Sequence, residues 1–274
     1  MASDHQQSAM HEHYALGEEA DRLSRSGAGR LEFERAQEIV LRHLPERPAT
    51  VADIGGGPGR YSLWLASLGY AVVHRDLVSS HVDQVRAAGA VTGGPAIDSA
   101  IADARSLDLA DASVDAVLLL GPLYHLTRRA DRVQALREAA RIVRPGGPVF
   151  AAAISRWAVR LDGILSQRLD RKYPHMAGMV DEVERTGVLP PLGPGSFCGF
   201  THRPGQLRAE VGSSGLQVAD LVAVEGAAYL TGDLDARVTD EDDWAVVLQT
   251  ARAHERVPEL MGLGSHLIAT AVRR

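Results

Sequence analysis

A run of glycines follows a short apolar segment near residue 50. The segment Asp53–Gly59 reads Asp-Ile-Gly-Gly-Gly-Pro-Gly, and residues 61–68 after it have the apolar spacing of a helix. A glycine turn between a strand and a helix lets a ligand approach the backbone and leaves N–H groups free to bind it. The dinucleotide-binding fingerprint would need a glycine at position 60, where Arg60 stands, so NAD is disfavoured. We therefore predict a site for a small ligand at this turn.

Two aspartates end further strand-like runs. Asp76 directly follows the run 71–75, and Asp103 follows a weaker run, 100–102. A carboxylate at the end of a strand, about 20 residues after a glycine turn, is placed to accept two hydrogen bonds from a ribose diol. Asp76 is therefore predicted to bind a ribose, with a capping or solvated aspartate as the alternative. For Asp103 the alternative is ordinary turn chemistry.

The order of these motifs resembles that of the class I S-adenosylmethionine-dependent methyltransferases. Their first motif is an acidic residue followed by x-G-x-G-x-G, and it is matched in full by Asp53, Gly55, Gly57 and Gly59. The resemblance covers residues 50–154 and continues through Asp76, Asp103–Arg105, the strand Asp115–Gly121 and the turn Arg144–Gly147. It implies S-adenosylmethionine as the cofactor and S-adenosylhomocysteine as its product.

The resemblance also implies which residues hold this cofactor. Asp76 would bind the ribose hydroxyls, and Asp103–Arg105 would contact the adenine. The N-terminal segments resemble the leader of a bacterial small-molecule branch, so Tyr14 is expected to wall the pocket and Arg35 to meet the methionine carboxylate. For Arg35 the alternative is an ion pair with a nearby glutamate. The full predicted set is Tyr14, Arg35, Asp53, Gly55, Gly57, Asp76, Leu77, Asp103, Ala104, Arg105 and Leu120.

The acceptor is expected just beyond Leu120, because ligands of open α/β sheets gather past the carboxyl ends of the strands. Tyr124 and His125 occupy that position. His125 is the preferred general base, because an imidazole titrates near neutral pH, and the alternative is that it caps a helix or shapes the pocket. The other candidate bases are Tyr14 and His202. Arg156, His202 and Glu225 are further substrate-binding candidates, each with a capping or surface role as the alternative.

Alternating β and α patterns must position these residues. Strand-like runs lie at 51–54, 71–75, 100–102, 114–120, 149–154, 216–224 and 266–272, with helix-like segments between them. This order predicts a Rossmann-like α/β fold with a mostly parallel seven-stranded sheet and helices on both faces. The alternation stops between 156 and 200, which predicts an inserted lid. The predicted parts are an N-terminal helical cap at 1–49 with a helix over Leu31–Leu44, a cofactor-binding core at 50–155, the lid at 156–200, and the C-terminal part of the core at 201–274.

The composition excludes several classes of function. The chain of 274 residues has a net charge of −6, and it contains one Cys, one Lys and no Asn. A P-loop, an intrachain disulfide and the Asn-Pro-Pro-Tyr motif of adenine and glutamine N-methyltransferases are therefore excluded. No basic face and no apolar run of about 20 residues is present, which predicts neither a nucleic-acid partner nor a membrane span and favours the cytoplasm. His5, His11 and His13 lack convergent ligands, so no metal is expected.

The sequence as a whole predicts a methyltransferase that moves a methyl group from S-adenosylmethionine to O, N or C of a small-molecule acceptor by in-line displacement. Three alternatives stay open. One is a cyclase or lyase that uses the same sulfonium cofactor on the same fold. Another is a methyltransferase of RNA or protein, and the third is a cofactor-binding module without catalysis. The chain is compatible with a homodimer.

Overall fold

The computed structural model describes residues 23–90, 97–191 and 198–274. The chain forms two compact units, which we name after a characteristic element of each. The glycine-loop unit comprises Val40–Ala152, Arg208–Asp220 and Ala269–Arg274, whereas the α11 unit comprises the described residues up to Ile39, Ala153–Leu207 and Leu221–Ile268. No helix among the described residues is both long and apolar enough to cross a membrane.

Parallel strands form the centre of the glycine-loop unit. They are β1 (Thr50–Ile54), β2 (Ala71–Asp76), β3 (Ile97–Ile101), β4 (Ala116–Leu119) and the first part of β5 (Pro148–Ser155), in the spatial order β3-β2-β1-β4-β5. All of β4 and nearly all of β1 is buried, as expected for central strands of a parallel sheet that is covered on both faces. The register pairs Asp53 with His74 on β2 and with Leu118 on β4, so the carboxyl ends of the central strands share one edge.

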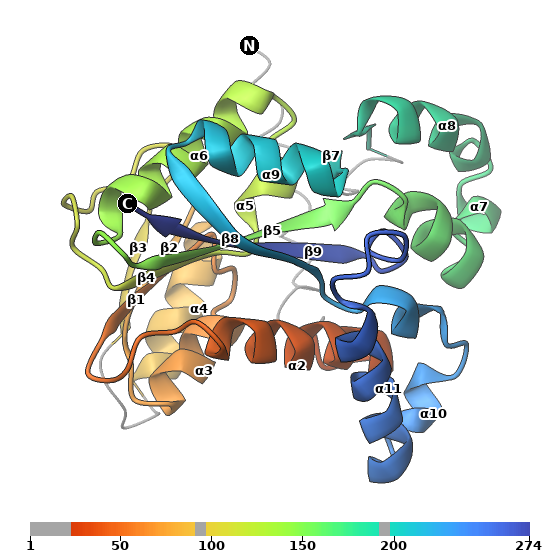
Figure 1. The fold of residues 1–274 in the computed structure, drawn as a ribbon, viewed down its shortest axis with the longest axis horizontal. Coiled ribbons are helices and arrows are strands. Elements are labelled where there is room, and N and C mark those ends of the chain that lie inside the picture. Colours follow the sequence, from red (N-terminus) through yellow and green to blue (C-terminus); the bar gives the residue numbers. More distant parts are fainter. Residues whose placement is uncertain (1–22, 91–96, 192–197) are drawn as a thin grey trace. The chain divides into compact units, whose positions relative to one another are not determined.

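Helices connect these strands and cover both faces of the sheet. They are α3 (Arg60–Ser67), α4 (Ser79–Gly89), the short α5 (Pro122–His125) and α6 (Arg129–Ile142). In Figure 1, α3 and α4 lie on one side of the strands and α6 lies on the other. The predicted Rossmann-like α/β fold is therefore confirmed.

The sheet contains two more strands than the predicted seven. The described residues supply nine strands in all, and the two unexpected ones are β6 (Val188–Leu189) and β7 (Gly199–His202), both at the end of the predicted lid. β7 is fully buried and pairs in parallel with the end of β5, where Ile154 lies opposite Thr201, and β6 pairs antiparallel with β7. The remaining strands are β8 (Leu216–Ala223) and β9 (His266–Arg273), and β9 pairs with both β5 and β8.

The α11 unit is mostly helical. It contains nearly all of α2 (Gly27–Leu41), a π-helical segment η1 (Val159–Ser166), α7 (Leu169–Lys172), α8 (Met176–Thr186), a 3-10 turn η2 (Gly226–Leu230), α10 (Leu234–Arg237) and α11 (Glu241–His254), while α9 (Pro204–Ser213) runs through both units. α2 begins before the predicted start at Leu31 because Ser26 caps it, with its Oγ accepting a hydrogen bond from the Gly29 N–H at 3.1 Å.

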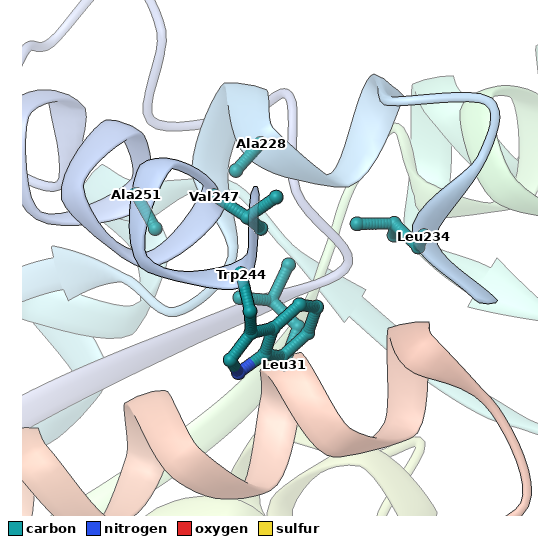
Figure 2. Close-up of a cluster of buried hydrophobic side chains, with 6 residues drawn as sticks. All are labelled: Leu31, Ala228, Leu234, Trp244, Val247 and Ala251. Atoms are coloured by element: carbon teal, nitrogen blue, oxygen red, sulfur yellow. The ribbon is translucent and has the colours of Figure 1, made fainter. Parts of the chain in front are cut away.

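A compact apolar cluster holds the helices of this unit together. Its buried members are Leu31, Ala228, Leu234, Trp244, Val247 and Ala251 (Figure 2). Trp244 of α11 lies beside Leu31 of α2 in this view, and its indole N–H donates to Glu34 at 2.8 Å. The amphipathic face of α2 is thus buried against α11, as the apolar stripe on this segment predicts.

Candidate active site

The glycine loop that follows β1 leaves one face of its backbone open. Gly57 has a φ of 56°, and a Cβ atom added there would have nothing within 4 Å. Gly55 is packed instead, since a Cβ there would come within 2.5 Å of Pro122. A positive φ is costly for residues with a side chain, and the open direction at Gly57 is where a ligand can reach the backbone. These features fit the predicted cofactor site.

Asp76 lies at the end of β2, as predicted, and its carboxylate binds the glycine loop. Oδ2 accepts a hydrogen bond from the Gly57 N–H at 2.8 Å, while Oδ1 accepts one from the Val78 N–H at 2.8 Å and lies 3.2 Å from Nδ1 of His81. Burial by itself would raise the pKa of Asp76, but these hydrogen bonds outweigh it and lower the pKa below its ordinary value. Asp76 is thus an ionised acceptor beside the loop, and its contact with a ribose stays a prediction.

Asp53 supports the loop from the interior. Its side chain is 1% exposed, and Oδ2 accepts a hydrogen bond from the Ser62 hydroxyl at 2.7 Å. Burial raises the pKa of Asp53. A Cβ added to Gly56 would lie only 2.5 Å from Oδ2 of Asp53, so the loop backbone rests directly on this carboxylate. Asp53, the acidic residue that begins the motif, therefore contacts the loop itself, and a direct contact of Asp53 with the cofactor stays a prediction.

The third predicted cofactor segment follows β3 and is occupied by an internal ion pair. Asp103 accepts hydrogen bonds from the backbone N–H of Arg105 at 2.9 Å and from its guanidinium at 2.5 to 3.1 Å. Burial alone would raise the pKa of Asp103, but the bonds from Arg105 outweigh it and lower the pKa. Ala104, Leu77 and Leu120 are partly exposed. Contacts of Asp103–Arg105 with an adenine, and of Leu77 and Leu120 with the cofactor, stay predictions.

The predicted acceptor residues Tyr124 and His125 lie in α5, next to the glycine loop. The turn that leads into α5 packs closely on this loop, since a Cβ on Gly121 would come within 2.7 Å of the Gly55 carbonyl oxygen. The rings of Tyr124 and His125 lie with their centroids 4.9 Å apart, and both side chains are partly exposed. The structure therefore places the start of α5 against the glycine loop, and contacts of Tyr124 and His125 with an acceptor stay predictions.

A buried ion pair that sequence reasoning missed holds the chain just after His125. Arg132 of α6 donates to the carbonyl oxygens of Leu126 and Thr127 at 2.8 and 2.9 Å. It also makes a two-pronged pair with Glu210 at 2.7 and 2.8 Å, and both side chains are nearly fully buried. This arrangement fixes the end of α5. No local spacing rule could have linked the two partners, because they lie 78 residues apart.

Arg35 has internal partners instead of the predicted methionine carboxylate. Its side chain is fully buried in the α11 unit and pairs with Glu38 and, at 2.5 Å, with Glu255. A further N–H lies 3.3 Å from the carbonyl oxygen of Val224. The structure shows the ion pair that was the alternative for Arg35. A cofactor carboxylate would have to compete with two glutamates for the same guanidinium.

Arg156 and His202 lie side by side in the α11 unit, and both side chains are buried. The backbone N–H of Arg156 donates to the carbonyl of His202 at 2.8 Å, and its guanidinium binds the Thr201 carbonyl at 3.1 Å and the Gln206 side chain at 2.6 Å. Phe200 lies beside both side chains, 5.4 Å from the guanidinium and 4.8 Å from the imidazole. These contacts are made within the protein, and contacts of Arg156 and His202 with a substrate stay predictions, as does the role of His202 as a base.

Glu225 forms a polar cluster with two residues that the sequence did not suggest. Its carboxylate, 1% exposed, accepts hydrogen bonds from the backbone N–H of His266 at 2.9 Å and from Nδ1 of the same residue at 2.6 Å. Glu32 approaches Nδ1 to 3.8 Å. One ligand atom from each of the three side chains lies within 4.8 Å of the others, a spacing that a cation could occupy. The predicted role of Glu225 with a substrate stays a prediction, and Tyr14 lies outside the described residues.

Comparisons with known proteins find a methyltransferase domain in this chain. A family model described as "Methyltransferase domain" matches residues 52–151. The chain is 33% identical over 132 residues to the ubiquinone/menaquinone biosynthesis C-methyltransferase UbiE of Acidiphilium cryptum, which covers 45% of this chain and 49% of that protein. It is 31% identical over 119 residues to the tRNA (carboxymethyluridine(34)-5-O)-methyltransferase ALKBH8 of Mus musculus, covering 43% of this chain and 16% of that protein. The chain therefore spans less than half the length of either relative.

The fold is also that of solved methyltransferases. A SAM-dependent methyltransferase from Methanosarcina mazei superposes with a TM-score of 0.58 over 86% of this chain and 96% of its own, at 18% sequence identity. The matched residues 52–151 contain β1, the glycine loop and Asp76. Residues 52–151 therefore match a methyltransferase domain, and the chain has the fold of a solved SAM-dependent methyltransferase.

Proposed function

We propose that the chain transfers a methyl group from S-adenosylmethionine to O, N or C of a small-molecule acceptor. The observation that carries this proposal is the close packing of the turn into α5 on the glycine loop. It supports a common site, because α5, which carries Tyr124 and His125, follows a turn packed on the same loop that is open at Gly57. Cofactor binding and acceptor chemistry are thereby assigned to adjacent segments.

The residues present fit the cofactor that the family uses. The cofactor, when bound, supplies a methyl group on a sulfonium, which leaves readily as a neutral thioether. The open backbone of Gly57 would admit its methionine part, and the ionised Asp76 offers acceptor oxygens for the ribose hydroxyls. The chain's contribution is then to align the acceptor with the methyl group and to exclude water.

His125 is proposed to accept the acceptor's proton. Methylation of a hydroxyl, an ammonium or an acidic carbon requires that the acceptor lose a proton, and an imidazole is the usual side chain for this task. His125 is the last residue of α5, and Arg132 binds the two carbonyl oxygens that directly follow it. The position of the imidazole is thereby supported by a buried ion pair.

A small molecule is preferred over RNA as the acceptor. The net charge of −6 disfavours a polyanionic partner, because affinity for nucleic acids depends on neutralising phosphates. The two named relatives differ in this respect: one, by its name, acts in quinone biosynthesis and the other on tRNA. A cytoplasmic location also belongs to the proposal, since the single Cys198 cannot form a disulfide within the chain.

Isotope labelling tests the proposal. The full chain is incubated with methyl-deuterated S-adenosylmethionine and either a small-metabolite extract, a tRNA preparation or a protein extract, and the labelled products are identified by mass spectrometry. We expect label in small molecules only, and none with Gly57→Val. Label confined to tRNA or protein would refute the small-molecule acceptor, while methylthioadenosine without methylated product would indicate a different sulfonium chemistry.

A further inference from the structure

The peptide groups of Gly57 are held from both sides by β2. Asp76 accepts the Gly57 N–H at 2.8 Å, and Nε2 of His74 lies 3.0 Å from the Gly57 carbonyl oxygen. His74 and Asp76 are two positions apart on one strand, so their side chains point to the same face. His74 is fully buried. One loop residue is thus bound through its N–H and its C=O to neighbouring side chains of β2.

The chemistry of these contacts determines where the His74 ring carries a proton. A carbonyl oxygen only accepts hydrogen bonds, so Nε2 carries a proton and donates to Gly57 whether the ring is neutral or charged. On its other side, Nδ1 lies 2.8 Å from the hydroxyl of Ser99 on β3, a buried group that can either donate or accept. Ser99 therefore supports the same ring orientation in both protonation states.

The loop also rests directly on this ring. A Cβ added to Gly56 would lie 2.7 Å from Cδ2 of His74 and 2.5 Å from Oδ2 of Asp53. The register of β1 and β2 places Asp53 opposite His74, so the two side chains form a common support for the loop. Glycine at position 56 permits this approach, and a change in the ring would be transmitted to the loop backbone.

We propose that His74 is a positioning residue for the cofactor, an inference that rests on the proposed use of the glycine loop by S-adenosylmethionine. Its Nε2–H holds the Gly57 carbonyl, which keeps the Gly57 N–H on Asp76 and the open face of Gly57 turned outward. The side chain is buried under the loop and acts through Gly57. Loss of this single donor is expected to loosen the loop and weaken cofactor binding.

Two substitutions of His74 separate the loss of the hydrogen bond to Gly57 from the loss of the packed imidazole ring. In His74→Gln the side-chain amide nitrogen reaches about as far as Nε2 and can still donate to Gly57, but it loses the contact with Ser99. In His74→Asn the nitrogen reaches about as far as Nδ1, so it keeps Ser99 and loses Gly57. Both variants remove an imidazole from the core and are matched in polarity. Ser99→Ala removes only the hydroxyl that orients the ring.

Calorimetry with S-adenosylhomocysteine provides the test, with the free energy of unfolding of each variant measured alongside. We expect His74→Gln to bind within about 3-fold of wild type and His74→Asn to bind about 10-fold more weakly, the usual effect of losing one hydrogen bond. Equal affinities of the two variants, or losses that follow stability alone, would overturn the proposal. If either variant does not fold, Ser99→Ala decides: a roughly 3-fold weaker affinity supports the proposal, and unchanged affinity refutes it. Failure of wild type to bind would refute the proposed function instead.

Discussion

Buried polar side chains serve different purposes in the two units of the chain. In the glycine-loop unit, Asp76 and His74 bind the backbone of a loop whose outward direction at Gly57 is open. In the α11 unit, Arg35 and Arg156 are bonded to carboxylate, carbonyl and amide groups of that same unit. All four side chains are polar and buried, so burial of a polar side chain alone does not distinguish a site from a support.

The distinguishing feature is what lies opposite each polar group. Arg35 forms ion pairs with two glutamates, so its buried positive charge is already neutralised by carboxylates of the protein. Asp76 faces backbone N–H groups of a glycine loop, which can exchange partners when a ligand arrives. We therefore expect substitutions of Gly57 and Asp76 to change cofactor affinity, and substitution of Arg35 to change stability.

The largest effect is expected for Gly57→Val, which should abolish measurable binding of S-adenosylhomocysteine while the chain still folds. A branched side chain would fill the open direction at Gly57 and strain a residue with a φ of 56°. Calorimetry checks the loss of binding, and circular dichroism checks that the variant still folds. Gly146→Val is the matched control, because Gly146 also has a positive φ and open space around a Cβ but lies in the turn before β5. Equal loss of binding in both variants would contradict this expectation.

Arg35→Met tests the expectation that a buried ion pair in the α11 unit contributes to stability. Removing one partner of a buried ion pair costs about 3 to 5 kcal/mol, and we expect the lower end because Glu255 keeps a contact with Arg256. Urea denaturation measures this loss, and calorimetry at low temperature should show unchanged cofactor affinity. Arg30→Met, in an exposed pair with Glu34 on the same helix, should cost at most about 1 kcal/mol. Weaker cofactor binding with intact stability would instead assign Arg35 to the cofactor.

His125→Ala should lower kcat by about 100-fold, the usual scale of general-base catalysis, with cofactor affinity nearly unchanged. The exposed His43 in the same unit provides the control, and His43→Ala should keep the wild-type rate. Steady-state kinetics on the acceptor found by labelling gives both values. Near-wild-type turnover of His125→Ala would show that another group removes the proton or that alignment alone suffices.

Asp76→Ala should weaken binding of S-adenosylhomocysteine by about 1.5 to 3 kcal/mol, the range for a hydrogen bond to a charged group. Asp98→Ala is the control, because Asp98 pairs with Arg75 at an exposed position on β3 and does not contact the loop. Titration calorimetry at a single salt concentration compares the two. An affinity of Asp76→Ala equal to that of wild type would move the ribose contact to another residue.

A smaller effect is expected in the pH dependence of stability. The pKa of Asp76 is lowered in the folded chain, so its carboxylate contributes stability that is fully present above the ordinary value of 3.8 and is lost as the pH falls through the lowered pKa. The difference in free energy of unfolding between wild type and Asp76→Asn should therefore shrink as the solution is acidified below about pH 4. Urea melts from pH 3 to pH 6 measure it. A difference that persists or grows on acidification would contradict the assigned charge.

The parts of the fold that sequence reasoning predicted are those with a local signal. Mostly apolar runs mark β1 and β4 to within about two residues, because strands buried on both faces consist mainly of apolar residues. β7 gave no such signal, since its Gly-Phe-Thr-His sequence follows a Pro- and Gly-rich stretch and becomes a strand only by pairing with the end of β5. Its formation depends on a tertiary contact.

At the site, too, the features with a local sequence signal were predicted and those that depend on tertiary contacts were not. The spacing of Gly57 and Asp76 along a strand-turn-helix-strand pattern was enough to predict that both serve one ligand site, and the structure shows a hydrogen bond between them. His74 was missed because a histidine inside a strand has no spacing that separates a support from a core residue. One of the two glutamate partners of Arg35 lies 220 residues away, so only the folded chain shows this second ion pair.

Titration of the full wild-type chain with S-adenosylhomocysteine, S-adenosylmethionine and NAD tests the central claim most directly. The glycine loop, open at Gly57 and bonded to Asp76, should bind both sulfur compounds with a stoichiometry of one per chain and should not bind NAD. Binding of NAD with no heat from either sulfur compound would contradict the assignment of this loop.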